Sequence, residues 1–194
     1  MNKQEANKFK KALKKGLKQI ANEERGKEGE WTTAIKRCLL QLAQDFDLSS
    51  NFHLTVPPGK TYVKHDNHEW LYDAILFKAT EKGIEEIILC VESEWNSDID
   101  ELFWDFSKLL VAKSKFHLMI FDAQKGKYEE TLNEFKKYIN NSKICKDLDE
   151  TYIFATYLKE DNEQLRFYEH KYKNTQRCGI NFFKPSCIGR KQTK

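Results

Sequence analysis

An alternation of strand-like runs with amphipathic helices constrains the fold of this chain more than any other feature of its sequence. β-Branched, aromatic and aliphatic residues dominate the strand-like runs, which we place at residues 52–56, 60–78, 87–95, 116–123, 151–158 and 164–173. Apolar residues recur at helical spacing elsewhere, which predicts helices over residues 4–20, 31–46, 97–113 and 128–140. This order of elements predicts an α/β fold with a central mixed sheet flanked by helices.

The length of 194 residues fits one domain that can bury a substantial core. Within it we expect a basic amphipathic helix and linker at residues 1–28, an α/β core at 29–160, and a strand with a basic, aromatic-containing tail at 161–194, packed on the core. No apolar run is long enough to cross a membrane. The lysine-rich start also lacks the apolar segment of a signal peptide, so we expect a cytoplasmic protein.

Charge is distributed unevenly along the chain. Residues 1–28 hold nine lysines and arginines against four glutamates, a net charge of +5, and residues 165–194 hold eight against one, a net charge of +7. Because the whole chain carries only +3, the part between these ends carries −9. Basic ends around an acidic body suit a protein that holds a polyanion and keeps carboxylates for a metal. The alternative is that the lysine-rich ends are simply solvated surface.

Three carboxylates interrupt two of the apolar runs. Asp73 lies in the run at 60–78, whereas Glu92 and Glu94 lie in the run at 87–95. Side chains two residues apart share one face of a strand, and pairing of the two runs as a hairpin would bring Asp73 opposite residues 90–92. Converging carboxylates repel each other unless a cation joins them, and oxygen ligands suit Mg²⁺ or Mn²⁺. Such a metal can activate water and neutralise charge on a phosphodiester. The alternative is a sheet with one wet face.

This pattern resembles the PD-(D/E)xK fold of restriction-endonuclease-like nucleases. Asp73 matches the Asp of the motif, Glu92 matches its acidic second position, and Glu94 stands where most members have Lys. Tyr72 replaces the Pro that often precedes the Asp. The resemblance covers about residues 30 to 160 and implies a Mg²⁺-dependent or Mn²⁺-dependent endonuclease acting on DNA, in which Asp73 and Glu92 hold the metal and Glu94 is a further ligand or a proton acceptor.

Other site residues follow from the same resemblance. Glu30 is the best match to the Glu that members often add to the metal site from the first helix. Glu28 or Glu24 is the next-best match. Some relatives supply the missing Lys from the helix after the motif strand, which makes Lys108 the candidate here. Glu101, Asp105 and Lys108 share one face of that helix, and the alternative is that this face is solvated surface carrying an Asp–Lys pair.

Basic residues elsewhere suggest how DNA would be held. Basic and aromatic residues interleaved suit contacts to phosphates and bases, and the candidates are Lys60, Lys64, Arg166, Lys171, Lys173 and Arg177. His65 and His68 are better explained by a polar loop than by a metal site. Small restriction enzymes usually dimerise, so the resemblance implies a homodimer. Two further interpretations are a catalytically inactive module that binds nucleic acid or protein, and a structural partner that docks through its N-terminal helix.

Overall fold

A computed structural model of the chain describes residues 1–23, 28–52, 65–66, 71–96, 98–122, 127–142, 150–158 and 164–172. It contains four helices within these ranges, which are α1 (Lys3–Glu23), α2 (Glu28–Asp45), α3 (Ile99–Val111) and α4 (Tyr128–Asn141). The strands are β1 (Ser49–Asn51), β2 (His65–Asp66), β3 (Ala74–Thr80), β4 (Gly83–Glu94), β5 (Phe116–Asp122), β6 (Glu150–Leu158) and β7 (Gln164–Tyr172). None of these helices is long and apolar enough to cross a membrane.

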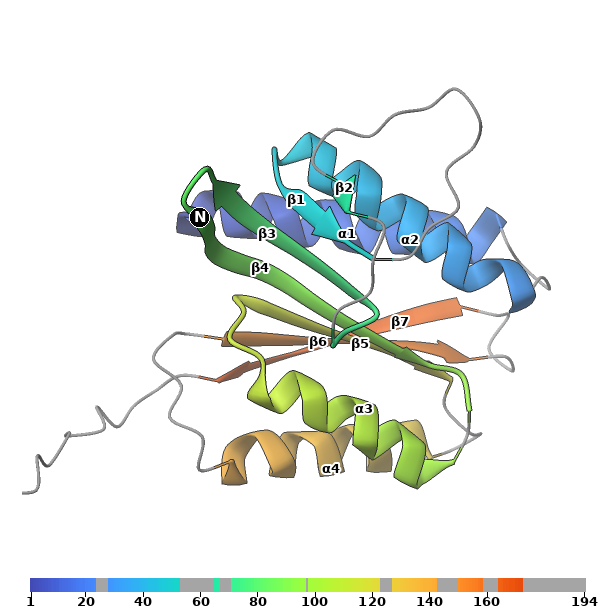
Figure 1. Cartoon of the computed structure of the whole chain (residues 1–194). Helices are drawn as coiled ribbons and strands as arrows, with labels where there is room; N and C mark the ends of the chain where they lie inside the picture. Colours follow the sequence, from blue (N-terminus) through green and yellow to red (C-terminus); the bar gives the residue numbers. More distant parts are fainter. Residues whose placement is uncertain are drawn as a thin grey trace, which may run out of the picture.

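The strands form one seven-stranded mixed sheet in the order β2-β1-β3-β4-β5-β6-β7. Strands β4, β5 and β6 are parallel, and β3 and β7 pair antiparallel on either side of them. Helices α1 and α2 cover one face of the sheet, and α3 and α4 cover the other (Figure 1). The predicted α/β class with a mixed sheet between helices is therefore confirmed.

Most predicted elements are present with shifted ends. The strand-like run at 60–78 differs from its prediction. The run at 60–78 is not one strand, because the described residues before Ala74 form bends and the two-residue strand β2. The β3–β4 connection is a tight hairpin in which Thr80 pairs with Gly83, whose φ of 122° few other residues adopt. Asp98 caps α3 by accepting a hydrogen bond from the backbone N–H of Asp100, and the preceding Ser97 lies outside the described residues.

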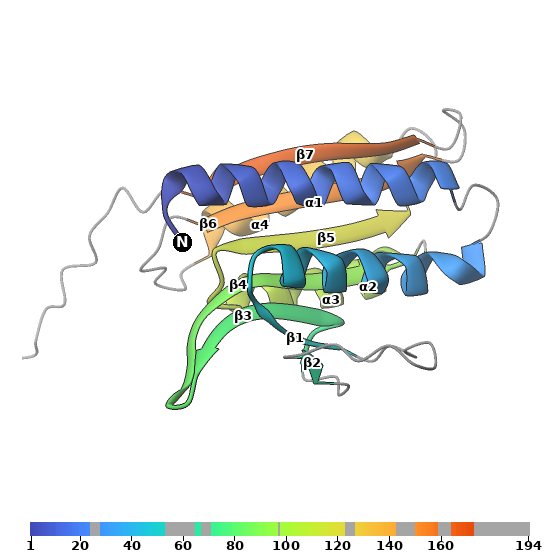
Figure 2. The same cartoon turned by 90° about the horizontal axis from the view of Figure 1, so that it is seen from above.

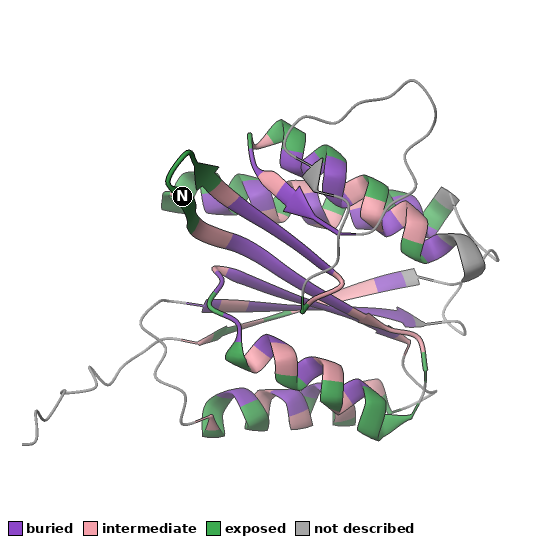
Figure 3. Cartoon of the chain, viewed as in Figure 1, coloured by how far each residue is buried: buried purple, intermediate pink, exposed green. Residues whose placement is uncertain are grey.

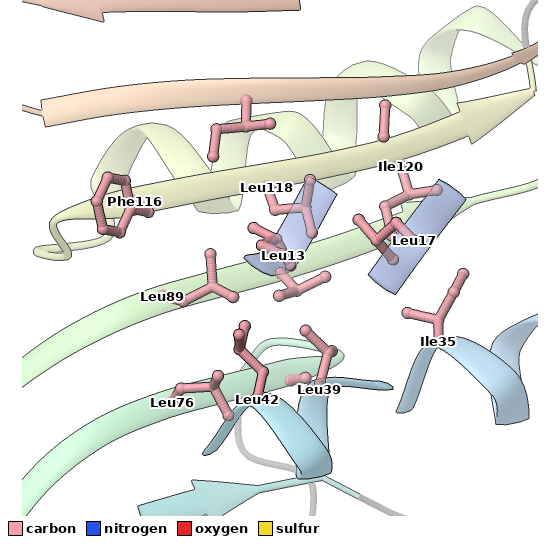
Figure 4. Packing of buried hydrophobic residues seen from close by; sticks show 14 of the residues in the cluster. Leu13, Leu17, Ile35, Leu39, Leu42, Leu76, Leu89, Phe116, Leu118 and Ile120 are labelled. Atoms are coloured by element: carbon pink, nitrogen blue, oxygen red, sulfur yellow. The ribbon is translucent and has the colours of Figure 1, made fainter. Parts of the chain in front are cut away.

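Two apolar layers hold the sheet between its helices. In the first layer, α1 and α2 pack on one face of the sheet through Leu13, Leu17, Ile35, Leu39 and Leu42 (Figure 4). Seen from above, α1 runs along the β5–β7 side and α2 along the β3–β4 side (Figure 2). In the second layer, α3 and α4 bury Phe106 and Phe135 against the opposite face. The central strands are thus buried on both faces (Figure 3), which explains their nearly continuous apolar sequence.

The apolar face of α1 is part of this core. Phe9, Leu13 and Leu17 are almost completely buried, and the Phe9 ring stacks on that of Phe116 in β5 with 5.3 Å between centroids. The sheet therefore covers the apolar face of α1, so the predicted docking of a partner through this helix would use its outer face.

Gly16 allows α1 and α2 to approach each other closely. A Cβ atom at Gly16 would lie 2.4 Å from the Sγ atom of Cys38 in α2. We therefore expect Gly16→Ala to lower the free energy of unfolding by about 1–2 kcal/mol, because the clash outweighs the better helix propensity of Ala. Urea unfolding would measure this change in the free energy of unfolding. Cys38→Ala in the Gly16→Ala background should recover the loss, and a stabilising effect of Gly16→Ala alone would contradict the close approach.

Candidate metal centre

Asp73 is held against the end of β4 by two hydrogen bonds. Its Oδ2 atom accepts one from the backbone N–H of Ser93 at 2.8 Å and one from the Ser93 hydroxyl at 2.7 Å. The sequence predicts Asp73 within a strand, but this residue lies in a bend immediately before β3. The chain first pairs with β4 at Ala74, which lies opposite Val91. Extending this register by one residue places Asp73 opposite Glu92, within the predicted range.

Glu92 is a buried carboxylate near the carboxyl end of β4. Only 1% of the residue is exposed, so the wet-face interpretation is wrong for this position. Its Oε2 atom accepts a hydrogen bond from the Nζ atom of Lys108 at 2.9 Å, whereas its buried Oε1 atom has no hydrogen-bond partner among the described residues. Burial raises the pKa of the Glu92 carboxyl to about 8, with Lys108 opposing the shift and Asp73 adding to it.

Lys108 reaches Glu92 from α3. This helix follows β4 directly and buries Leu102, Phe106 and Leu109 against the sheet, which turns the neighbouring face with Lys108 toward the end of β4. The ammonium also contacts Asp105 Oδ1 at 2.8 Å, and its side chain is 24% exposed. Burial lowers the pKa of Lys108, but the hydrogen bonds to Asp105 and Glu92 outweigh burial and raise it overall. The Asp–Lys pair of the solvated-surface alternative is thus present, and Lys108 pairs in addition with the buried Glu92.

Glu94 and Tyr72 border this group. Glu94 is the last residue of β4 and its Oε1 atom accepts a hydrogen bond from the backbone N–H of Asn96 at 2.5 Å. Burial raises the pKa of Glu94, the Asn96 N–H opposes this shift, and the nearby carboxylates of Asp105 and Glu101 add to it. Burial, with Cys90 and Glu92, raises the pKa of Tyr72 to about 12. The phenol therefore stays neutral at the edge of a negatively charged site.

The other predicted site residues lie elsewhere or are not described. Glu30 is in the first turn of α2, but its side chain is outside the described part. The next residue, Trp31, packs its ring 5.7 Å from that of Trp95, which follows Glu94. Arg166 and Lys171 lie on the edge strand β7, and β5 and β6 separate them from β4. The predictions for Lys60, Lys64, Lys173 and Arg177 fall outside the described residues, as do His68 and the side chain of His65.

Two residues of the site were not predicted as members. Ser93 orients Asp73, and Asp105 binds the ammonium of Lys108. Asp105 could have been selected from the sequence, because it is three residues before Lys108 on a helix face that carries no apolar residue. Ser93 had no such signal, because its role depends on where the bend before β3 places Asp73.

A divalent cation fits the carboxylates of Asp73 and Glu92. The buried Oε1 atom of Glu92 has no hydrogen-bond partner among the described residues, and coordination to a cation would satisfy this oxygen. The carboxylates of Asp73, Glu92, Glu94 and Asp105 also outnumber the ammonium of Lys108, which contacts two of them, Glu92 and Asp105. No three His, Cys, Asp or Glu side chains within the described ranges converge as a complete metal site. Two carboxylates are enough for Mg²⁺, which commonly keeps several waters and takes oxygens from a phosphate.

Lys108→Met tests the pairing between α3 and β4 without any assay of activity. Removing the ammonium takes away the charge that stabilises ionised Glu92, so we expect the pKa of the Glu92 carboxyl to rise by at least about one unit. Carboxyl-detected NMR titration would measure it. Lys113→Met is the matched control, because Lys113 is exposed just after α3, and it should leave the titration unchanged. An unchanged Glu92 pKa in Lys108→Met would show that the two groups do not meet.

Comparison with known proteins gave no match among family models, curated proteins or solved structures. The chemistry of the site is therefore argued from its own geometry. That geometry consists of two adjacent carboxylates at the end of β4, one of them buried, and a lysine from the following helix.

Proposed function

We propose that this protein is a metal-dependent DNA endonuclease of restriction-endonuclease-like fold. The observation that carries the proposal is the buried Oε1 atom of Glu92, which has no hydrogen-bond partner among the described residues and lies in a carboxyl next to Asp73. Burying a carboxyl with an unpaired oxygen is costly. A cation bound at this site would offset that cost.

In this proposal each side chain has a separate task. Asp73, fixed by Ser93, and Glu92, fixed by Lys108, are the two protein ligands of Mg²⁺ or Mn²⁺. A divalent cation there would supply a Lewis acid that polarises the phosphodiester and neutralises its charge. Glu94 is a further ligand or accepts a proton from the attacking water. Glu30 completes the set as an outer ligand from α2.

Lys108 takes the place of the motif Lys, which this chain lacks at position 94. Its ammonium lies 2.9 Å from Glu92, so it is next to the atoms that would bind the metal. A positive charge at that distance can stabilise the negative charge that develops on a phosphate during hydrolysis. Supply of this charge from α3 would leave the end of β4 free to carry Glu94.

A cleavage assay tests the proposal directly. Purified protein should cut plasmid, linear duplex or single-stranded DNA in the presence of Mg²⁺ or Mn²⁺, and EDTA should stop the reaction. Cutting both strands of a duplex at one place needs two sites, so we expect a homodimer on duplex substrates. If all three forms of DNA stay intact with either metal, the protein is not an endonuclease.

The raised pKa of Glu92 makes metal binding depend on pH. A metal ligand must be deprotonated, and the Glu92 carboxyl holds its proton up to a pKa of about 8. Protons therefore compete with Mn²⁺ below pH 8, and the apparent affinity should rise about tenfold per pH unit from pH 6 to 8 and then level off. Calorimetric titration would measure the profile. An affinity that is constant between pH 6 and 8 would mean that Glu92 is not a titrating ligand.

The second candidate function is an inactive module that binds nucleic acid or a protein partner. One observation favours it: the described residues bring no more than two candidate ligands together, and Lys108 already pairs with Glu92. A decayed nuclease site closed by its own lysine would have this arrangement. Two results together would favour this module over the enzyme. DNA would be retained in a salt-dependent way without being cleaved, and titration with Mn²⁺ would release no heat.

A further inference from the structure

The outer face of α1 carries a row of lysines. Every described residue on this face is exposed and either basic or uncharged, and the members are Gln4, Asn7, Lys8, Lys11, Lys15, Lys18 and Asn22. None of the four lysines forms an ion pair with a carboxylate in the part of the chain that the structure describes, although the Lys18 ammonium lies 5.9 Å from the centre of the Phe167 ring. We call these four lysines the α1 lysine row.

The carboxylate of Glu169, on the strand beside α1, is already neutralised. Glu169 on β7 accepts hydrogen bonds from Lys10 at 2.9 Å and from Lys14 at 2.5 Å. These two lysines lie on the side of α1 that faces β7, and they lower the pKa of Glu169 against the effect of burial. The positive charge of the outer row is therefore not offset by this edge of the sheet. Lys171, two residues after Glu169 on the same face of β7, is exposed and extends the basic surface.

The spacing of the row suits a regular polyanion. Successive members are three, four and three residues apart, which corresponds to steps of about 4.5–6 Å and a length of about 15 Å along the helix. One strand of a nucleic acid carries a charge about every 3.4 Å of its axis. Flexible lysine side chains at these intervals can therefore each reach a separate phosphate.

An anionic membrane fits this helix less well. Binding in a membrane interface requires an apolar face that enters the lipid, and the apolar face of α1 is buried on the sheet by Phe9, Leu13 and Leu17. The outer face contains no apolar side chain among its described residues. Phosphate contacts alone also give no base readout, so the row suits binding that does not depend on sequence.

We propose that the α1 lysine row binds the sugar–phosphate backbone of nucleic acid independently of its sequence. This surface lies on the face of the sheet opposite to α3 (Figure 1), so it is separate from the carboxylates at the end of β4. It does not require a metal. The proposal therefore goes beyond the proposed endonuclease activity, and the two can fail separately.

Fluorescence anisotropy of a labelled 20-nucleotide duplex, measured in EDTA from 50 to 300 mM KCl, tests this surface without cleavage. Each lost phosphate contact reduces the slope of log K against log salt by about 0.9 for a duplex. Replacing Lys8, Lys11, Lys15 and Lys18 together by Gln should therefore reduce the slope by about 3 to 4 and weaken binding at least about tenfold at 100 mM salt. Replacing all four by Arg should preserve the slope.

The matched control removes the same charge elsewhere. Lys82, Lys113, Lys127 and Lys137 are exposed outside α1, and their joint replacement by Gln should leave most of the binding. Gln is a good helix former, and circular dichroism confirms that each variant folds. Equal loss of binding in both sets would show a general effect of net charge and overturn the proposal. The proposal is also overturned if the wild-type protein does not bind DNA, or if it binds only vesicles that contain phosphatidylserine.

Discussion

Glu92→Gln is expected to reduce Mg²⁺-dependent DNA cleavage by at least about a hundredfold. Loss of residues that only orient a metal ligand commonly costs 10–100-fold, and Gln replaces a proposed ligand itself. The change keeps the shape of the side chain and lets it bond to Lys108, which contacts Glu92 at 2.9 Å. The fold should therefore persist. Asp73→Asn should have a similar effect, because Asp73 is the second proposed ligand.

The control for this pair is Asp122→Asn. Asp122 is the last residue of β5 and lies at the same end of the parallel strands, but it is not among the groups that shift the pKa of Glu92. Cleavage should change less than about threefold in this variant, within the range of context effects for a residue outside the metal shell. If Glu92→Gln and Asp73→Asn retain the activity of the wild type, any cleavage comes from another site.

Phe9→Ala should lower the free energy of unfolding by about 3–5 kcal/mol, the usual cost of removing a buried aromatic ring. Phe9 is fully buried. Its ring stacks on Phe116 in β5 at 5.3 Å and meets Phe46, just after α2, edge-on at 5.2 Å. The loss is a large share of the stability of a typical domain, so the variant should unfold at much lower urea concentration.

Asn7→Ala is the matched control for Phe9→Ala. Asn7 lies two residues earlier in α1 and is exposed, so its replacement should change the stability by less than about 0.5 kcal/mol. A small effect of Phe9→Ala, equal to that of Asn7→Ala, would mean that α1 folds as a separate element. A large effect would show that residues 1–28 and the α/β core unfold together.

The sequence predicted the elements better than it predicted the environment of each side chain. Helical spacing of Phe9, Leu13 and Leu17 identified α1 and its apolar face, because periodicity is a local property. It did not reveal what covers that face. The order of the elements also predicted a sheet flanked by helices, and the two helix layers bury β4, β5 and β6 on both faces.

The candidate site was predictable in part. Alternation placed Glu92 and Glu94 on one face of β4, and the short hairpin placed Asp73 opposite residues 90–92, a range that includes its observed position opposite Glu92. The contact between Lys108 and Glu92 depends on how α3 packs after β4, and sequence spacing does not determine such packing. The helix face that carries Lys108 could therefore be identified from the sequence, whereas the carboxylate that Lys108 contacts could not. The bend before β3 was mistaken for strand because its neighbours are aromatic and aliphatic.

The most direct test of the metal centre is a crystal of the protein soaked with Mn²⁺ and measured for anomalous scattering. We expect a peak between the carboxylates of Asp73 and Glu92, with the Oε1 atom of Glu92 as a ligand. The same soak of the Glu92→Gln variant should show no peak there. Absence of a peak at this position in the wild-type protein, or a peak that remains in Glu92→Gln, would contradict the proposed metal centre.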